Sequence, residues 1–491
     1  MHNKKYYILS GILLLLAGLI LTTSDAAAKN IIHFFGTLLN KQLNETFWSI
    51  GFAHAGVELI LAASLLFLFI LFFNKYPLQT LILASCAWIL SFVFYVLTDT
   101  VNIPFHDDYF FLRFLNNYST NRDLGEIFSQ NNESRLIFMK ALCVLLFHLH
   151  SFNIKTLAIV ANLCLFGSVL LMFKSIHLEM KNKMLLLLAL TILIFQFEFY
   201  DSSVWAAGAL YSSCTIFFAF TAIYFLTSRI RNGFSLSLVF AVLSVMSCGV
   251  GFITLAIGLF ILVFRKRIKE CIIWAVTAIL LFLFYFHNYS FAYEHYCFGF
   301  SFEISIYRII TCILFSFTFL GSPTQFLYQT TSPMILGAFI WIFFLFLTYK
   351  KYFTKNSTIY YMLLFILLTS LIPAVFRQNI TIYEGINMRY GIYSIMAISC
   401  CVIALTEIIN TQKFKMFIRF ALPLFIIFHL LTSIFFYPEV ILRKEQMVTM
   451  IQNFKRTGVP SMPQPYSQYV ADDAKFLLNE CSKKNIYKIP D

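Results

Sequence analysis

Two adjacent aspartates, Asp107 and Asp108, lie in the stretch PFHDDYF at 104–110, directly after a long apolar run. Neighbouring carboxylates raise each other's pKa, because two anions so close together repel. A pair of this kind suits a general base or a metal ligand. The alternative is a solvated loop in which one aspartate caps a helix that begins near Tyr109. The local sequence allows both interpretations.

A second polar group of residues follows in NNESRLIF at 131–138, where Glu133 and Arg135 precede an apolar helix. Acidic residues are common in the first turn of a helix, so a simple helix start explains Glu133. A cation in that position is locally unfavourable. Arg135 therefore indicates a further partner.

A third candidate is Asp201 in FEFYDSSVWAAG at 197–208, close to Trp205 and Tyr211. An aromatic ring beside a carboxylate is a common way to hold a sugar, because the ring stacks on CH groups while the acid accepts hydroxyl hydrogen bonds. Aromatic residues also gather at any membrane interface, and this explains Trp205 taken alone.

The late stretch VFRQNITIYEGINMRYGIYS at 375–394 contains Arg377 and Arg389. We expect this stretch on the outer side of the membrane, where several other connectors of this sequence contain no arginine. The guanidinium group offers a fixed fork of donors that suits phosphate. Snorkelling to the lipid surface is the alternative. Glu384 lies in the same stretch and is a candidate for contacts to a sugar or an acceptor.

These polar stretches must be positioned by a strongly apolar chain. It has 491 residues, 60% of them hydrophobic and only 12% charged, and its mean hydropathy is +0.79. A helix that spans a bilayer needs about 20 apolar residues, and such windows recur along the whole sequence. We therefore expect an all-α polytopic membrane protein with about 13 transmembrane helices, at 6–23, 51–73, 78–98, 154–173, 184–199, 208–226, 234–248, 250–264, 271–286, 334–349, 358–375, 391–408 and 418–436.

The basic residues indicate an orientation for these spans. Positive charge collects in cytoplasmic connectors, and the outer connectors at 200–207, 287–306 and 321–333 contain no Lys or Arg. The alternate connectors hold the basic residues Lys75, Lys174, Lys181, Lys183, Arg229, Arg231, the run RKRIK at 265–269, Lys350, Lys351, Lys355, Lys413 and Lys415. The net charge of +13 therefore reflects membrane topology rather than nucleic-acid binding.

Two further apolar stretches, 136–150 and 304–320, could each be counted as a span, but counting just one of them would place the downstream basic connectors on the wrong side. We expect both to be interfacial or re-entrant helices on the outer face, which is possible when they pack against protein. The membrane domain then covers 1–437, with outer catalytic loops at 99–135, 200–207, 287–306 and 374–390. A small extracytoplasmic segment, 438–491, is predicted to hold one amphipathic helix.

One ionisable pair is predicted inside a span, because His54 and Glu58 lie one helical turn apart. Ionisable groups within a membrane are functional candidates. A mutual hydrogen bond near the outer end of the span is sufficient to explain them.

Taken together, these residues give a chain that resembles the GT-C class of membrane glycosyltransferases, in particular the phage and bacterial branch that modifies O-antigen by serotype conversion. The resemblance rests on an early outer aspartate pair, an acid-x-Arg element before the next helix and a late Arg followed by Arg-Tyr. It departs from the family at Ser134, where His is usual, and at Met388, where Ser is usual. The residues that carry it are Asp107, Asp108, Glu133, Arg135, Arg377, Arg389 and Tyr390.

The resemblance implies an inverting hexosyltransferase in the bacterial cytoplasmic (inner) membrane, with its site facing the periplasm. Its donor would be a polyprenyl-phosphate sugar, its acceptor a surface polysaccharide such as O-antigen, and its companions a flippase and a polyprenyl-phosphate sugar synthase. Asp107 and Asp108 would be catalytic, and no metal is required, although a divalent ion is possible. The donor phosphate would contact Arg377, Arg389 and Tyr390, and the sugar or acceptor would contact Glu133, Arg135, Asp201, Trp205 and Glu384.

Two other functions fit an apolar chain with outer polar loops. A polysaccharide polymerase or ligase would transfer a preassembled oligosaccharide, and the early aspartate pair favours the transferase over it. A lipid-linked sugar flippase would carry charged residues at the mid-depth of several spans, whereas this sequence places most of its charges at one face.

Overall fold

The computed structural model describes residues 2–39, 44–131, 134–150, 152–228, 230–290, 292–293, 298–299, 306–376, 381–460 and 468–490. This described part is helical apart from one antiparallel pair of two-residue strands, β1 (Ala292–Tyr293) and β2 (Phe298–Gly299). The chain divides into two compact units, each made of separated segments.

Ten helical stretches in the described part are long and apolar enough to cross a membrane, and an eleventh span is possible if the bent pair 8–23 and 26–34 forms one crossing. The structure thus confirms a polytopic helical membrane protein, and the count of 13 spans stays a prediction. The ten stretches are Glu45–Phe72, Pro77–Asp99, Ile154–Ser175, Ala206–Thr227, Ile268–Phe286, Ile306–Thr324, Thr331–Tyr349, Ser357–Val375, Met388–Ile408 and Thr411–Thr457.

The differences from the sequence expectation have physical reasons. The span expected at 184–199 ends as a helix at Ile194, because a polar turn follows in which the Glu198 N–H donates to Gln196 Oε1 at 2.5 Å. The helices at 233–247 and 252–264 are short, as the expected hairpin requires. The stretch 306–324, expected to be interfacial or re-entrant, has the length and hydropathy of a span. By contrast, the helix at 137–149 is short.

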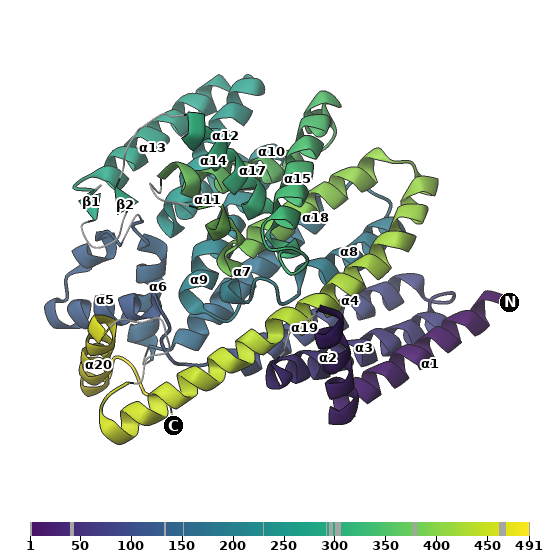
Figure 1. Ribbon diagram of the computed structural model, residues 1–491. Helices are drawn as coiled ribbons and strands as arrows, with labels where there is room; N and C mark the ends of the chain where they lie inside the picture. The colour runs from purple at the N-terminus through teal and green to yellow at the C-terminus, as the bar shows by residue number, and fades with distance from the viewer. Residues whose placement is uncertain are drawn as a thin grey trace. The chain divides into compact units, whose positions relative to one another are not determined.

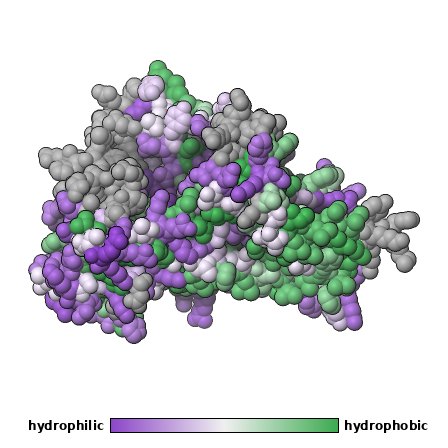
Figure 2. Space-filling view, turned by 60° about the horizontal axis from the view of Figure 1, so that its bottom comes forward, coloured by the Kyte–Doolittle hydropathy of each residue, from purple (hydrophilic) through white to green (hydrophobic). Residues whose placement is uncertain are grey.

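Unit 1 comprises 1–99, 176–200 and 405–445. Two of its helices approach closely at Gly18 and Gly56, where a Cβ on either glycine would lie within 3 Å of the other's carbonyl oxygen. Small residues at such crossings are typical of helix packing in membranes. Figure 2 shows a broad hydrophobic surface over these N-terminal helices. The helices of unit 1 are α1 (His2–Thr23), α2 (Asp25–Leu39), α3 (Glu45–Phe72), α4 (Pro77–Asp99), α8 (Met180–Ile194) and the first part of α19 (Thr411–Thr457).

Unit 2 comprises 100–175, 201–404 and 446–491. Its core is built around a buried helical stretch, 206–227, that packs against α7, α11, α12 and α17. A π-helical turn at Leu210–Cys214 interrupts this stretch, and such turns are frequent at functional sites. The α-helices of unit 2 are α5 (Asp108–Asn121), α6 (Ile137–Leu149), α7 (Ile154–Ser175), α9 (Ala206–Ala209), α10 (Thr215–Thr227), α11 (Gly233–Ser247), α12 (Phe252–Phe264), α13 (Ile268–Phe286), α14 (Ile306–Gly321), α15 (Thr331–Tyr349), α16 (Tyr352–Lys355), α17 (Ser357–Phe376), α18 (Gly391–Ile408) and α20 (Gln468–Lys483).

Short 3-10 helices lie in the connectors between the α-helices and in the loops that carry the candidate site. They are η1 (Leu124–Phe128), η2 (Tyr200–Ser202), η4 (Gly249–Gly251), η5 (Ser322–Thr324), η6 (Ile382–Ile386) and η7 (Met388–Tyr390), with the π-helical turn as η3.

Residues 446–491 belong to unit 2, and α20 within them packs against α5 (Figure 1). The helix α19 continues without a break through the expected boundary at 437/438. The amphipathic tail helix predicted from the sequence is present as α20. Beyond it, Tyr487 donates from its hydroxyl to the Asn102 carbonyl at 2.6 Å, and the Phe152 N–H donates to the Ile486 carbonyl at 2.8 Å. The tail is therefore hydrogen-bonded to the chain at Asn102, shortly before the aspartate pair.

This packing predicts that Leu478→Ala destabilises the protein far more than Phe476→Ala. Leu478 is fully buried in the cluster shared with α5, whereas Phe476 is 56% exposed on the same helix. Truncating a buried leucine to alanine costs about 2–5 kcal/mol. Thermal unfolding of the detergent-solubilised full-length protein measures the difference, and equal melting temperatures for the two variants would show that α20 is not docked.

Candidate active site

Asp108 is a buried connector between two loops of unit 2. Its side chain is 1% exposed, and its two carboxylate oxygens accept from the Phe105 N–H at 3.1 Å and from the Ala207 N–H at 2.9 Å. The second bond satisfies a backbone donor in the first turn of α9, which has no intrahelical partner of its own. Asp108 therefore fixes the turn at 105–108 against the start of the 206–227 stretch.

Burial raises the pKa of Asp108 to about 8, and the neighbouring charge of Asp107 acts in the same direction. The two N–H donors oppose this shift, because they stabilise the ionised form. The carboxyl group is thus close to neutral at physiological pH, and it is enclosed by protein. These properties suit a positioning group better than a base that must reach a substrate.

Trp205 forms a second bond between the same two loops. Its indole N–H donates to the Phe105 carbonyl at 3.0 Å, and its ring centroid lies 5.9 Å from that of Phe105 and 5.7 Å from that of His106. The indole is 8% exposed. The ring predicted as a floor for a sugar is therefore enclosed by packing in this structure, with the exposed His106 beside it.

Asp107 differs from its neighbour in both burial and geometry. It is half-buried and stands at the N-cap position of α5, but its side chain makes no capping hydrogen bond. The preceding residue, His106, has a φ of +45°. A left-handed backbone at a non-glycine residue is uncommon and is often found at functional sites. Helix capping, the purely structural explanation for the aspartate pair, therefore does not account for Asp107.

The same loop of unit 2 also contacts the late arginine segment. The Ser202 hydroxyl donates to the carbonyl oxygen of Arg389 at 2.9 Å and accepts from the Ser212 hydroxyl at 3.1 Å. Asp201 immediately precedes Ser202, so it lies in this junction. The segment 201–207 thus hydrogen-bonds to the aspartate turn on one side and to the 388–390 turn on the other.

Arg389 has one guanidinium donor, Nε, without a hydrogen-bond partner among the residues that the structure describes. Its guanidinium carbon lies 5.1 Å from the ring centroid of Tyr390, while its buried Nε has no hydrogen-bond partner in the structure. The Tyr390 ring packs 4.7 Å from that of Phe319 in α14. The Asn387 side chain accepts from the Arg389 N–H at 3.1 Å and fixes the turn. The Tyr390 ring therefore orients one face of the guanidinium, and Nε is left without a partner.

Glu384 has a local structural partner. It forms a capping box with Thr381 at the start of η6, accepting from the Thr381 N–H at 3.4 Å. Its side chain is exposed. Its predicted contact with a sugar or an acceptor stays a prediction.

Arg135 is buried among carbonyl groups. Its guanidinium donates to the carbonyls of Phe128, at 2.6 Å, and His287, and its backbone N–H donates to the Tyr285 hydroxyl at 3.0 Å. These bonds join the end of η1 to the end of α13. The partners that the sequence indicated for Arg135 therefore include backbone carbonyl groups. Glu133 and Arg377 lie outside the described residues.

Sequence reasoning missed Lys140, which is fully buried in α6. Its ammonium group donates to the carbonyl and hydroxyl of Ser129, both at 2.7 Å, and lies over the rings of Phe110 and Phe114. Burial lowers the pKa of Lys140 to about 8. The signal was available, because a single cation in an otherwise apolar helix requires a specific partner.

No group of three or more His, Cys, Asp and Glu side chains that could hold a metal ion occurs in the part of the chain that the structure describes. Protein carboxylates at 107 and 108 thus have no third side-chain ligand of these types within that part.

Comparison with known proteins finds no matching family model, no similar curated protein and no similar solved structure.

The bonding of the aspartates predicts unequal stability effects for the same substitution. Asp108→Asn replaces one carboxylate oxygen by an amide nitrogen, which cannot accept from a backbone N–H, and leaving a buried donor unpaired costs about 1–3 kcal/mol. Asp107→Asn removes no capping bond and should change the melting temperature much less. Thermal unfolding of both purified variants tests this difference, and an unchanged melting temperature for Asp108→Asn would contradict the connector role.

The raised pKa of Asp108 also predicts a pH dependence. Between about pH 4 and about pH 8 the folded protein holds a proton on Asp108 that the unfolded chain has released, so this group makes stability fall as pH rises through that window. Melting temperatures of the wild type and Asp108→Asn across the window should show this slope in the wild type alone. Parallel pH profiles would exclude a perturbed carboxyl at this position.

Proposed function

We propose that the protein is an inverting membrane glycosyltransferase of the GT-C type, which moves a single hexose from a polyprenyl-phosphate donor to a surface polysaccharide. The observation that carries the proposal is the segment 201–207. Through Ser202 it bonds to the backbone of Arg389, and through Trp205 and Ala207 it bonds to the turn that presents Asp107. A base and a phosphate-binding cation are the two groups that this transfer needs close together.

The reaction is a single displacement. The Asp107 carboxylate takes the proton of an acceptor hydroxyl as that oxygen bonds to the anomeric carbon. The bond from the anomeric carbon to the phosphate oxygen breaks at the same time, and the polyprenyl phosphate leaves with the electron pair. Attack from the face opposite the leaving group inverts the anomeric centre.

The two aspartates have separate roles in this proposal. Both oxygens of Asp108 are occupied by backbone donors and its side chain is enclosed. Asp107 is half-buried on a strained turn. We therefore assign the base to Asp107 and the positioning of its turn to Asp108.

Arg389 supplies the stabilisation of the leaving phosphate. Donors fixed in advance at a site of developing negative charge lower the barrier without reorganisation, and stacking on Tyr390 holds the guanidinium in one orientation. The remaining predicted residues, Asp201, Glu133, Glu384 and Arg377, are assigned to the sugar, the acceptor or the phosphate by the family resemblance. A multi-pass protein of the bacterial inner membrane with its site towards the periplasm meets such lipid-linked donors in the outer leaflet.

Sugar transfer by purified variants tests the proposal, with a radiolabelled polyprenyl-phosphate hexose and the isolated polysaccharide. Asp107→Asn should lower the turnover rate by about 10²–10⁴-fold, the range for loss of a general base. Arg389→Ala should lower it by about 10²–10³-fold, as expected for loss of one stabilising donor group. Asp472→Asn and Arg122→Ala make matched changes at exposed positions and should leave the rate unchanged.

The products separate this function from the alternatives. A single-residue addition leaves the length distribution of the polysaccharide unchanged, whereas a polymerase or ligase shifts it by whole oligosaccharide units. Full activity of Asp107→Asn, or a product extended by repeat units, would overturn the assignment.

A further inference from the structure

Unit 1 contains buried ionisable side chains that the proposed transfer reaction does not use. Glu58 of α3 and His429 of α19 are each 2% exposed, and Glu58 Oε2 lies 3.4 Å from His429 Nε2. Ser91 of α4 donates to the other carboxylate oxygen at 3.3 Å. Three helices with the composition of spans therefore meet at one acid.

Glu58 lies at the middle of a helix that is long and apolar enough to cross a membrane. It is the fourteenth of the 28 residues of α3, and at a rise of about 1.5 Å per residue it lies about 20 Å from either end. From the sequence we expect the His54–Glu58 pair near the outer end of its span, and this stays a prediction. Ionisable groups within membrane spans are rare and often mark ion or proton pathways.

The cluster is not a closed set of hydrogen bonds. Several of its buried polar atoms have no hydrogen-bond partner in the structure, and each such atom costs about 1–3 kcal/mol. Ion pairs kept only for structure have their remaining donors and acceptors satisfied. The atoms concerned are His54 Nδ1, Trp88 Nε1, His429 Nδ1 and Ser433 Oγ, whereas Glu58 Oε2 and His429 Nε2 face each other at 3.4 Å.

A file of polar groups connects the cluster to the end of α4. His429, Ser433, Tyr437 and Lys444 follow one face of α19, at spacings of four, four and seven residues. The His54 ring lies 3.7 Å from the Tyr437 ring, between centroids. The file thus continues from the acid towards Tyr437 within unit 1.

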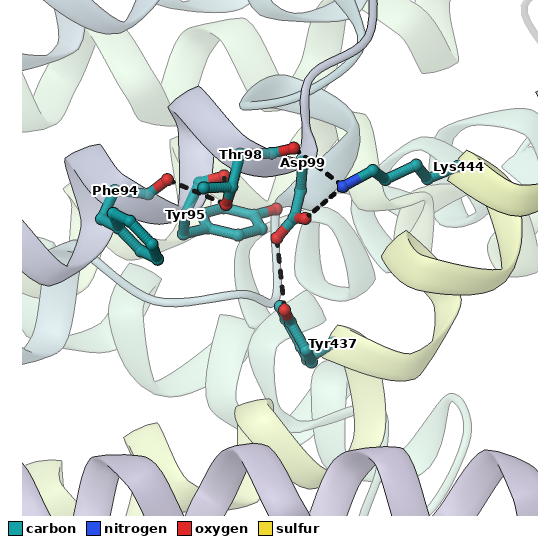
Figure 3. A network of polar contacts seen from close by, with 6 residues as sticks. All are labelled: Phe94, Tyr95, Thr98, Asp99, Tyr437 and Lys444. Atoms are coloured by element: carbon teal, nitrogen blue, oxygen red, sulfur yellow. Dashed lines mark hydrogen bonds and ion pairs between the residues drawn. The ribbon is translucent and has the colours of Figure 1, made fainter. Parts of the chain in front are cut away.

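The outer part of the file is shown in Figure 3. The Tyr437 hydroxyl donates to Asp99 Oδ2 at 3.3 Å, and Lys444 Nζ lies 3.0 Å from Asp99 Oδ1 and donates to the Thr98 carbonyl at 2.8 Å. Asp99 is buried, whereas the Lys444 side chain is one-third exposed. Lys444 is therefore where the file meets solvent.

We infer that Glu58 and His429 form an exchangeable proton-binding site within the membrane, which receives its proton from the surface along Lys444, Asp99, Tyr437 and His54. The ionisable groups that face it come from α3 (His54), from α4 (Asp99 and Tyr95) and from α19 (Tyr437 and Lys444), and the aromatic ring of Phe197 covers His54. A site of this kind gives the protein a proton-coupled step that sugar transfer alone does not require.

The proton balance of the file is simple. Lys444 gives a proton to Asp99 and takes one from bulk water, so the ammonium group ends unchanged. Tyr437 gives its hydroxyl proton towards His54 and takes the proton from Asp99, so the phenol ends unchanged. One ring nitrogen of His54 gains this proton while the other gives its proton to Glu58, where an O–H bond forms. One proton has moved from water to the buried carboxylate, and His54 ends as its other tautomer, which must revert before the next transfer.

Labelling with dicyclohexylcarbodiimide tests the site, because this apolar reagent modifies protonated carboxyl groups inside membranes. The full-length protein in liposomes is labelled at a series of pH values, and the modified residue is identified by peptide mass spectrometry. We expect labelling of Glu58 that declines as pH rises, and none in Glu58→Gln. No labelling of Glu58 at any pH would show a permanently ionised structural pair and would overturn the inference.

The route is tested by the time course after a pH jump. Tyr437→Phe removes the hydroxyl in the file, and the loss of Glu58 labelling should slow on the order of 10²-fold with the same end point. Tyr95→Phe makes the same change at a neighbouring ring of α4 and should keep the wild-type rate. Equal rates for the two variants would exclude this route.

Asp107→Asn provides the separation from the transfer reaction. It should label at Glu58 as the wild type does, even though its sugar transfer is lost. A dependence of the labelling on Asp107 would contradict an independent site.

Discussion

The candidate site depends on one buried carboxylate, which accepts hydrogen bonds from backbone N–H groups of two different segments. Asp108 ties the turn at 105–108 to the start of the buried stretch 206–227, and Trp205 adds a second bond between the same loops. Ser202 extends the connection to Arg389. Helices of unit 2 pack on several sides of this stretch. The loops are therefore hydrogen-bonded to the core of the unit, whereas surface connectors are usually mobile.

The helical part of the fold was largely predictable, because hydropathy and length decide it. The limit of such reasoning is visible in two places. The helix of 184–199 stops at Ile194, since the backbone of the following polar turn is satisfied by Gln196. The stretch 306–324 has a span's composition although charge alternation argued against a crossing. The first outcome depends on local hydrogen bonds that a hydropathy profile does not contain, and in the second the hydropathy and the charge pattern point to different results.

The residues of the candidate site could be chosen from the sequence, but their packing and bonding could not. The sequence singled out Asp107 and Asp108 as a pair, but which of them is enclosed depends on Ala207, about 100 residues away. Arg135 was identified by its misfit at a helix start, whereas its carbonyl partners at 128 and 287 follow only from the tertiary fold. The capping box of Thr381 and Glu384 was readable from the T-x-x-E spacing alone, and that spacing gives Glu384 a structural reason to be acidic.

Two buried carboxyl groups show why burial by itself does not identify function. Asp108 and Glu58 are almost equally enclosed. Each Asp108 oxygen meets a backbone N–H, so the group completes the hydrogen bonding of the main chain and has no need of another partner. Glu58 has one weak hydroxyl donor and a histidine at ion-pair distance, and the polar atoms around it are also unsatisfied. A folded chain tolerates such a deficit only where something else compensates it. For this reason the incomplete set in unit 1 supports the proton site that we infer there, whereas the complete set in unit 2 fixes the turn that carries Asp107.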